Sequence, residues 1–192
     1  LDKARKSNLE ARPLGIGVQG WQTLLFELRL PFDAPEAMAL NRRIFAHIYY
    51  HAWSESARLA AAEGAYPAFE GSPLARGELH ADTYDVPLEP GLDWGALRRD
   101  VRRGVRNSML TAIMPTASTA QICGNTEACE PHASNIYVRR TLAGEFVQVN
   151  RHLVRDLERI GAWNAQTKNA IIEADGSVQG LPQVPTDLQK LY

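Results

Sequence analysis

The strongest constraint on the fold is a long helical pattern between Asp33 and Gly64. Asp33, Pro35 and Glu36 are typical of a helix start, because Asp caps free amide groups and Pro is favoured in the first turn. Apolar residues then recur at near-helical spacing, and Gly64 is typical of a C-terminal cap. The pattern predicts a helix of about 40 Å, at 1.5 Å per residue, buried on one side. Its apolar positions are Leu40, Ile44, Ile48, Ala52 and Leu59, with Phe45 and Tyr49 on the adjacent row.

The remaining segments alternate between strand and helix patterns. The compact apolar run Ser108–Met114 predicts a buried strand, which Pro115 interrupts. Strands interleaved with helices favour an α/β architecture. We expect an irregular segment at 65–91, further strands at 136–140 and 145–149, and further helices within 14–30 and at 94–104, 151–160 and 163–174.

Composition narrows the class of protein. The 192 residues suffice for one ordinary domain, and 45% hydrophobic against 22% charged residues allow a packed core. The net charge of −1 argues against a nucleic-acid or membrane-surface binder. No apolar run approaches the roughly 20 residues of a membrane-spanning helix, and the polar N-terminal segment does not resemble a signal peptide. With two cysteines, the composition favours a chain of a reducing compartment, and we expect a cytoplasmic location.

Both ends predict that the chain is a segment of a longer protein. Residue 1 is Leu rather than Met. At the other end, Thr186 as N-cap and Gln189 three residues later predict a capping box, after Pro185. The expected helix stops at Tyr192, and a helix of less than two turns is not stable in water on its own.

Gly15, Gly17 and Gly20 form the Gly-x-Gly-x-x-Gly pattern of dinucleotide-binding folds. That pattern binds a dinucleotide only when a strand precedes it and an acidic residue follows further on. The polar residues 8–13 are not a buried strand, and Asp33 belongs to a helix start. We therefore expect these glycines to allow close backbone packing.

The turn Pro115–Thr119 has the composition of an anion site. It follows the predicted strand, and Thr116, Ala117, Ser118 and Thr119 have small side chains and consecutive backbone amides. If a helix begins here, its free amides and positive dipole end favour an anion. The alternative is that Thr116 or Ser118 only caps the helix.

Other clusters point less clearly to chemistry. Cys123 and Cys129 lack Cys-x-x-Cys spacing, and we expect two buried apolar cysteines. Glu127, Glu130 and His132 match metal ligands in type, but Pro131 prevents one regular face, and we expect no metal. His47 and His51 are expected on the polar side of the long helix. The basic run Arg98, Arg99, Arg102, Arg103 and Arg106 indicates a solvated helix face.

A set of specific motifs runs from Trp94 to Asn150, and three more lie before it. On these motifs the chain resembles the large (alpha) subunit of class I ribonucleotide reductase, of the eukaryotic-type group. The resemblance covers nearly the whole chain, from about Ser7 onward. The motifs are Gly15-Ile-Gly-Val-Gln-Gly20, Tyr49-Tyr50, Gly71-Ser-Pro73, Trp94-Gly-Ala-Leu97, Gly104-Val-Arg-Asn107-Ser-Met-Leu-Thr-Ala-Ile-Met-Pro115, Thr116-Ala-Ser-Thr-Ala-Gln121, Gly124-Asn125, Glu130-Pro131, Ser134-Asn-Ile-Tyr137, Arg139-Arg140 and Gly144-Glu-Phe146.

The resemblance implies that residues 1–192 are a single partial domain, from the C-terminal half of the ten-stranded α/β barrel. It implies that Pro115, Thr116, Ala117, Ser118 and Thr119 bind the phosphates of a ribonucleoside diphosphate, chiefly through backbone amides and small hydroxyls. The implied reaction replaces the ribose 2′-hydroxyl by hydrogen through a thiyl radical, for DNA synthesis. Thioredoxin or glutaredoxin supplies the electrons through cysteine pairs.

The implied partners are the substrate, the rest of the alpha chain, a radical-generating metal-containing small subunit, and a second alpha subunit. Nucleotide effectors act on the holoenzyme. The resemblance implies no cofactor or metal bound by this segment itself, and we expect neither nucleic acid nor membrane as a partner.

One departure from the family limits the expected activity. The motif Asn-Pro-Cys-Ser-Glu, which holds the radical cysteine and the general acid/base in the family, is absent. No catalytic residue is therefore assigned, and Tyr49-Tyr50 are not taken as the family's radical-relay tyrosines. Three hypotheses remain: part of a working reductase, an inactive structural or split-gene module, and a free-standing phosphate binder. We expect the segment alone to be inactive and poorly soluble, because a part-barrel leaves strand edges unpaired.

Overall fold

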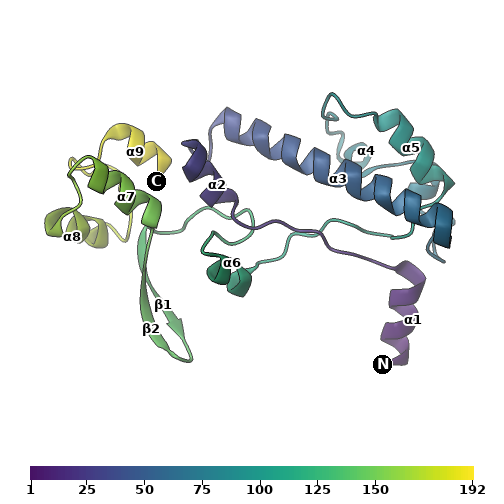
Figure 1. Cartoon of the computed structure of the whole chain (residues 1–192), viewed down its shortest axis with the longest axis horizontal. Coiled ribbons are helices and arrows are strands. Elements are labelled where there is room, and N and C mark those ends of the chain that lie inside the picture. Colours follow the sequence, from purple (N-terminus) through teal and green to yellow (C-terminus); the bar gives the residue numbers. More distant parts are fainter. The chain divides into compact units, whose positions relative to one another are not determined.

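The longest element is helix α3, Pro35–Glu63, in the computed structural model, which describes all 192 residues (Figure 1). Pro35 is its first residue, a position where the missing N–H of proline removes no helical hydrogen bond. The helix ends where Gly64 adopts a left-handed φ of 86° and donates its N–H to the Ala60 carbonyl at 2.8 Å. The helix predicted between Asp33 and Gly64 is confirmed.

The burial of α3 differs from the prediction by one row. The predicted row, from Leu40 to Leu59, is half-buried. The buried positions are Ala37, Trp53, Ser56, Ala57 and Ala60. Trp53 continues the adjacent row of Phe45 and Tyr49, because these residues are spaced four apart.

The chain forms two compact units. The first contains Leu1–Val18 and Met38–Met114, and the second contains Gln19–Ala37 and Pro115–Tyr192. The single partial domain expected from the sequence stays a prediction. No helix of the structure combines the length and the apolar character that crossing a membrane requires.

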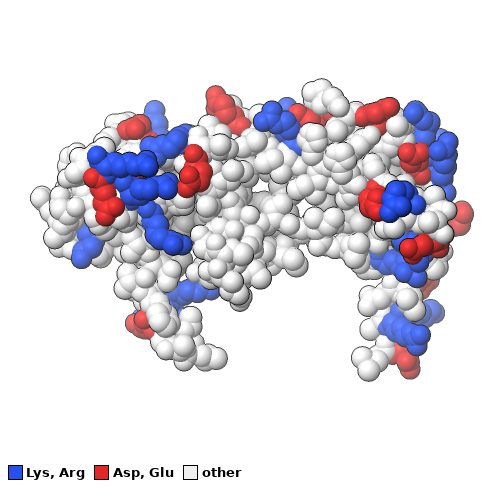
Figure 2. All heavy atoms as spheres, viewed as in Figure 1, with Lys and Arg blue, Asp and Glu red and all other residues white.

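The first unit holds most of α3 together with four shorter helices. Helix α1 has no buried residue, and Figure 2 shows charged side chains of both signs over it. Helix α5 begins after Asp93, whose carboxylate accepts the Ala96 N–H at 2.8 Å, and it ends at Gly104 as predicted. The segment 65–91, expected to be irregular, contains two short helices. The shorter helices are α1 (Asp2–Ala11), the 3-10 helix η1 (Leu74–Arg76), α4 (His80–Tyr84) and α5 (Trp94–Arg103).

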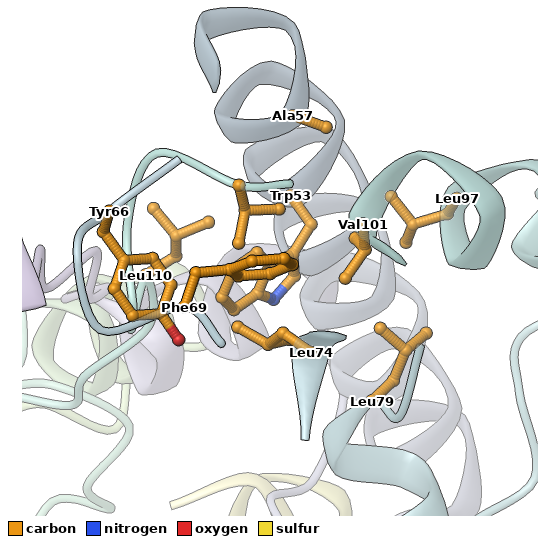
Figure 3. Close-up of a cluster of buried hydrophobic side chains, with 10 residues drawn as sticks. Trp53, Ala57, Tyr66, Phe69, Leu74, Leu79, Leu97, Val101 and Leu110 are labelled. Carbon is orange, nitrogen blue, oxygen red and sulfur yellow. The ribbon is translucent and has the colours of Figure 1, made fainter. Parts of the chain in front are cut away.

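The core of the first unit lies where α3 and α5 face the loops around them (Figure 3). Trp53 from α3 is the largest fully buried side chain there. Leu97 and Val101, one turn apart on α5, are fully buried as well. The other members are Ala57, Tyr66, Phe69, Leu74, Leu79, Val105 and Leu110.

The run Ser108–Met114 differs from the buried strand predicted for it. It is extended and lies parallel to the glycine segment, with a bridge between Ile16 and Thr111. Its side chains are mostly not buried, however: Leu110 is buried, whereas Met109, Ile113 and Met114 are 54%, 56% and 53% exposed. The prediction of full burial was wrong because only one neighbouring strand is present beside this run.

The second unit contains a β-hairpin and five helices. Strands β1 (Ile136–Thr141) and β2 (Gly144–Val149) pair antiparallel, with Ile136 opposite Val149 and Thr141 opposite Gly144. Both predicted strands are confirmed. The helices are α2 (Trp21–Leu28), α6 (Ala117–Cys123), α7 (Arg151–Arg159), α8 (Ala165–Glu173) and α9 (Thr186–Leu191).

The core of the second unit is formed by α7, α8, α9 and the segment before α9. Asn150 caps α7, and Leu153 and Leu157 on the next turns are fully buried. Thr186 is the first residue of α9 rather than its N-cap, and α9 has no side-chain cap. Gln189 instead accepts the Gly180 N–H at 2.9 Å, so the predicted capping box is wrong.

Candidate functional site

The glycine segment and the run before Pro115 form a close parallel backbone pair. Ile16 donates its N–H to the Leu110 carbonyl at 2.8 Å, and Ala112 donates to the Ile16 carbonyl at 3.0 Å. A Cβ at Gly17 would lie 2.6 Å from the Ala112 carbonyl oxygen, so only glycine fits there. The expectation that these glycines serve backbone packing is confirmed.

The turn Pro115–Thr119 leads into α6 through an unusual backbone conformation. Thr116 is left-handed, with φ 56° and ψ 24°, which is uncommon for a β-branched residue. Ala120 has the first backbone N–H of α6 with an acceptor: it donates to the carbonyl of Thr116, the N-cap residue, at 2.8 Å. The amides of Ala117, Ser118 and Thr119 precede it, and they have no acceptor in the protein. The structure therefore places three free N–H donors in succession, on exposed residues.

The hydroxyls of the turn divide into two that serve the fold and one that is free. The Thr116 hydroxyl accepts the Ala128 N–H at 2.9 Å, and the Thr119 hydroxyl donates to the Gln19 side-chain oxygen at 2.8 Å. The Ser118 hydroxyl has no partner in the protein. No side chain caps α6, so the alternative that Thr116 or Ser118 acts only as a cap is wrong.

The surroundings of the turn are nearly free of charge. Residues 107–126 include no Lys, Arg, Asp or Glu, and Figure 2 shows an uncharged surface over α6. One cation lies against the first turn of α6: Arg139 Nη2 is 3.4 Å from the Ala117 carbonyl oxygen, and its Nη1 is 3.6 Å from Glu127. Because no carboxylate belongs to the turn, an anion there meets neutral donors without repulsion from the turn itself.

The cysteines lie in different environments. Cys123, the last residue of α6, is exposed, so the expectation of two buried cysteines is wrong for it. Cys129 is half-buried, and burial together with nearby Glu130 raises the pKa of its thiol. A raised pKa keeps a thiol protonated and weakly nucleophilic.

The histidines and acidic residues do not form a metal centre. No group of three or more His, Cys, Asp and Glu is arranged to hold an ion. His132, near Glu130, stacks on Phe26 at 5.8 Å, and burial lowers the pKa of its imidazole. His47 and His51 are exposed on α3 as expected, with their rings stacked at 5.9 Å.

The basic run on α5 and just after it has a structural function that the sequence did not predict. Arg98 and Arg102, one turn apart, donate to the carbonyls of Gly77 and Arg76, both at 3.0 Å. Arg106 donates to the carbonyls of Glu63 and Gly64 at the end of α3, at 3.2 and 3.1 Å. These three arginines therefore donate hydrogen bonds to backbone carbonyls at the ends of η1 and α3. The interpretation of the run as a merely solvated face is wrong for them.

Sequence reasoning missed Gln19. It is separated from Thr119 by 100 residues, yet their side chains are hydrogen-bonded. Gln19 lies within the Gly15–Gly20 motif, but no local pattern predicts its contact with Thr119, because that contact depends on the way the chain returns to the start of α2.

The whole chain, residues 1–192, matches the family model described as "Ribonucleotide reductase, barrel domain". The ribonucleoside-diphosphate reductase large chain of Encephalitozoon cuniculi is 49% identical over 193 aligned residues, which cover 100% of this chain and 25% of that relative. Large chain 2 of Saccharomyces cerevisiae is 47% identical, with 100% and 22% covered. The solved class Id ribonucleotide reductase alpha subunit of Actinobacillus ureae matches with a TM-score of 0.72 at 26% identity, over 100% of this chain and 29% of that one. The chain thus spans about a quarter of the length of the curated relatives it matches.

Proposed function

Because this chain belongs to the ribonucleotide reductase barrel-domain family, we propose that it is part of a ribonucleoside-diphosphate reductase large subunit. In this proposal the complete enzyme converts ribonucleoside diphosphates to 2′-deoxyribonucleoside diphosphates, with electrons from thioredoxin or glutaredoxin. The turn Pro115–Thr119 binds the substrate phosphates. The observation that carries the assignment is the row of three unpartnered amides at Ala117, Ser118 and Thr119.

The proposed contribution of this segment is binding and orientation. The three N–H groups and the free Ser118 hydroxyl donate to phosphate oxygens, and the small side chains let those oxygens approach the backbone. Phosphate binding far from the reacting ribose fixes the position of the sugar, which lowers the barrier of a reaction carried out by other residues. The radical and redox chemistry is assigned to other parts of the large subunit and to a radical-generating, metal-containing small subunit.

Replacement of Ser118 by leucine tests the site. In the complete large subunit that contains this segment, Ser118→Leu removes one donor and covers the neighbouring amides. We expect KM for a ribonucleoside diphosphate such as CDP to rise about tenfold or more, because charge-assisted hydrogen bonds contribute roughly 1.5–3 kcal/mol each. Ser7→Leu adds the same apolar volume on the exposed helix α1 and is expected to leave KM within about twofold. Unchanged KM in Ser118→Leu would exclude the turn as the phosphate site.

A structural or split-gene module is the second candidate. It is favoured by apolar side chains that both units expose: Met109, Ile113 and Met114 in the first, and Ile122 in the second. Exposed apolar surface of this kind is typical of a face that another segment covers. Deoxyribonucleotide formation by the segment with the small subunit and reductant, but without any other alpha-chain segment, would contradict this candidate. Activity that appears only when the missing segment is added would support it.

A further inference from the structure

We propose that Gln19 is a positioning residue of the phosphate turn and also supplies two of its hydrogen-bond donors. This inference rests on the function proposed above. The Thr119 hydroxyl donates to Gln19 Oε1 at 2.8 Å, which is shorter than its 3.3 Å approach to the Thr116 carbonyl. Gln19 therefore fixes the orientation of the last hydroxyl of the turn.

The backbone around Gln19 is itself held firmly. Gly20 donates its N–H to the Thr126 carbonyl at 2.8 Å, in a left-handed conformation with φ 83°. The left-handed φ favours glycine, and a Cβ at Gly20 would also crowd the Asn125 side chain at 3.1–3.3 Å. Thr23 and Thr126 add a reciprocal pair: each backbone N–H donates to the hydroxyl of the other, at 3.3 and 3.0 Å.

The same loop holds both sides of the turn. Thr126 fixes Gly20, next to Gln19, and Ala128 donates its N–H to the Thr116 hydroxyl. Gln19 and Thr116 are thereby positioned by residues two apart in one loop. This arrangement explains how a left-handed threonine, an uncommon conformation, is retained at the start of α6.

The hydrogen bond to Thr119 determines what else Gln19 can do. Because Oε1 is the acceptor, the amide Nε2 of Gln19 carries two N–H donors, and neither has an acceptor in the protein. Gln19 is half-buried, and the bond of its Oε1 to Thr119 holds these donors beside the turn. They extend the row of neutral donors at Ala117, Ser118 and Thr119 toward a phosphate oxygen.

Two substitutions at Gln19 separate its two contributions in the complete large subunit. Gln19→Glu keeps an acceptor for Thr119 but replaces the donors by a negative oxygen. We expect it to raise KM for CDP about twentyfold or more, with kcat changed less than threefold. Gln19→Leu removes both contributions without adding charge, and a rise of about fivefold is expected. The matched control is Gln121→Glu, which adds the same charge on the exposed face of α6, where the Gln121 side chain makes no hydrogen bond. We expect less than a twofold change in KM.

A double-mutant cycle tests whether Gln19 acts through Thr119. If it does, Gln19→Leu and Thr119→Val together raise KM less than the product of their separate effects. Multiplicative effects, or a Gln19→Glu variant that matches Gln121→Glu, would overturn the inference. The inference fails alone if Ser118→Leu raises KM while the Gln19 variants do not; if none of these variants changes KM, the phosphate turn itself is wrong.

Discussion

The N-termini of α6 and α7 lie in the same unit, but their free amides are used differently. At α7 the Asn150 side-chain oxygen accepts the N–H groups of His152 and Leu153, at 3.1 and 3.5 Å. At α6 the Thr116 hydroxyl turns away to Ala128 and leaves the first three amides without an acceptor. A capped helix start serves the fold, whereas an uncapped start on an uncharged, exposed turn leaves its donors for an anion.

The largest effect is expected when α6 is given its own negative charge. Ser118→Asp places a carboxylate in the first turn, where it interacts favourably with the helix dipole and occupies the free amides. The same carboxylate repels a phosphate, so we expect KM for CDP to rise about a hundredfold while hydrogen exchange of α6 amides becomes slightly slower. Enzyme kinetics and hydrogen–deuterium exchange on the complete large subunit measure the two effects.

The neutral variant Ser118→Asn is the control for size. It has nearly the same shape as Asp without the charge, and we expect a change of only a few-fold in KM. If Ser118→Asn and Ser118→Asp were equally impaired, steric blockage would explain the loss, and the difference drawn between the two helix starts would not depend on anion binding.

At α7 we expect substitution of the cap to change the stability of the helix and to leave KM unchanged. Asn150 is buried, and it also donates its Nδ2 to the Asn135 side-chain oxygen at 2.8 Å. Asn150→Ala removes the cap and leaves that oxygen unpaired, which we expect to destabilise α7 by about 2 kcal/mol. Exchange of α7 amides should become roughly thirtyfold faster, since 1.4 kcal/mol corresponds to a factor of ten.

The two contributions at Asn150 are separable by a third residue type. Asn150→Ser retains a capping oxygen but loses the donor to Asn135, so its effect should fall between those of wild type and alanine. We expect neither variant to change KM for CDP by more than about twofold. A large rise in KM with unchanged exchange would place α7, rather than α6, at the substrate.

The sequence correctly predicted those elements whose start and end are determined by residues near each other in the chain. The helix start at Pro35 and the left-handed Gly64 depend on a few neighbouring residues, and both lie where expected. The motifs between Trp94 and Asn150 identified the family, and the match over residues 1–192 confirms it, together with the barrel fold class. The phosphate role of Pro115–Thr119 stays a prediction.

Features that depend on distant partners were missed or mistaken. Arg98 and Arg106 looked like solvated residues because the carbonyls they bind come from segments far away in the sequence. Exposure of Cys123 and Ile113 depends on which segments cover them, which no local pattern specifies. Gln19 belongs to the same class, since its partner is 100 residues further on.

The smallest expected effect concerns Asp156, a buried residue of α7 whose carboxylate binds side chains outside that helix. Arg29 and the Tyr192 hydroxyl both bind Asp156, the latter at 2.6 Å. Burial opposes ionisation of Asp156, but these hydrogen bonds outweigh it and lower the pKa of the carboxyl. A carboxyl whose pKa is lower in the folded state adds stability above its unfolded pKa of about 3.9, and that stability is lost as pH falls through the folded pKa.

Asp156→Asn should therefore weaken α7 at neutral pH and matter less in acid. At pH 7 we expect about fivefold faster exchange of α7 amides, normalised to intrinsic rates, because hydrogen bonds to a charged group are lost while Arg29 can turn to solvent. The gap between wild type and variant should narrow as the pH falls below about 4, where the carboxyl binds a proton in the unfolded state, and should close as the pH passes the lower pKa of the folded state. Glu173→Gln, which removes a carboxylate without an ion pair on α8, is the control. A gap that stays constant down to pH 2 would show that Asp156 supports α7 by shape rather than by charge. The start of α6, where no carboxylate belongs to the turn, would then not differ from α7 in the use of a negative charge.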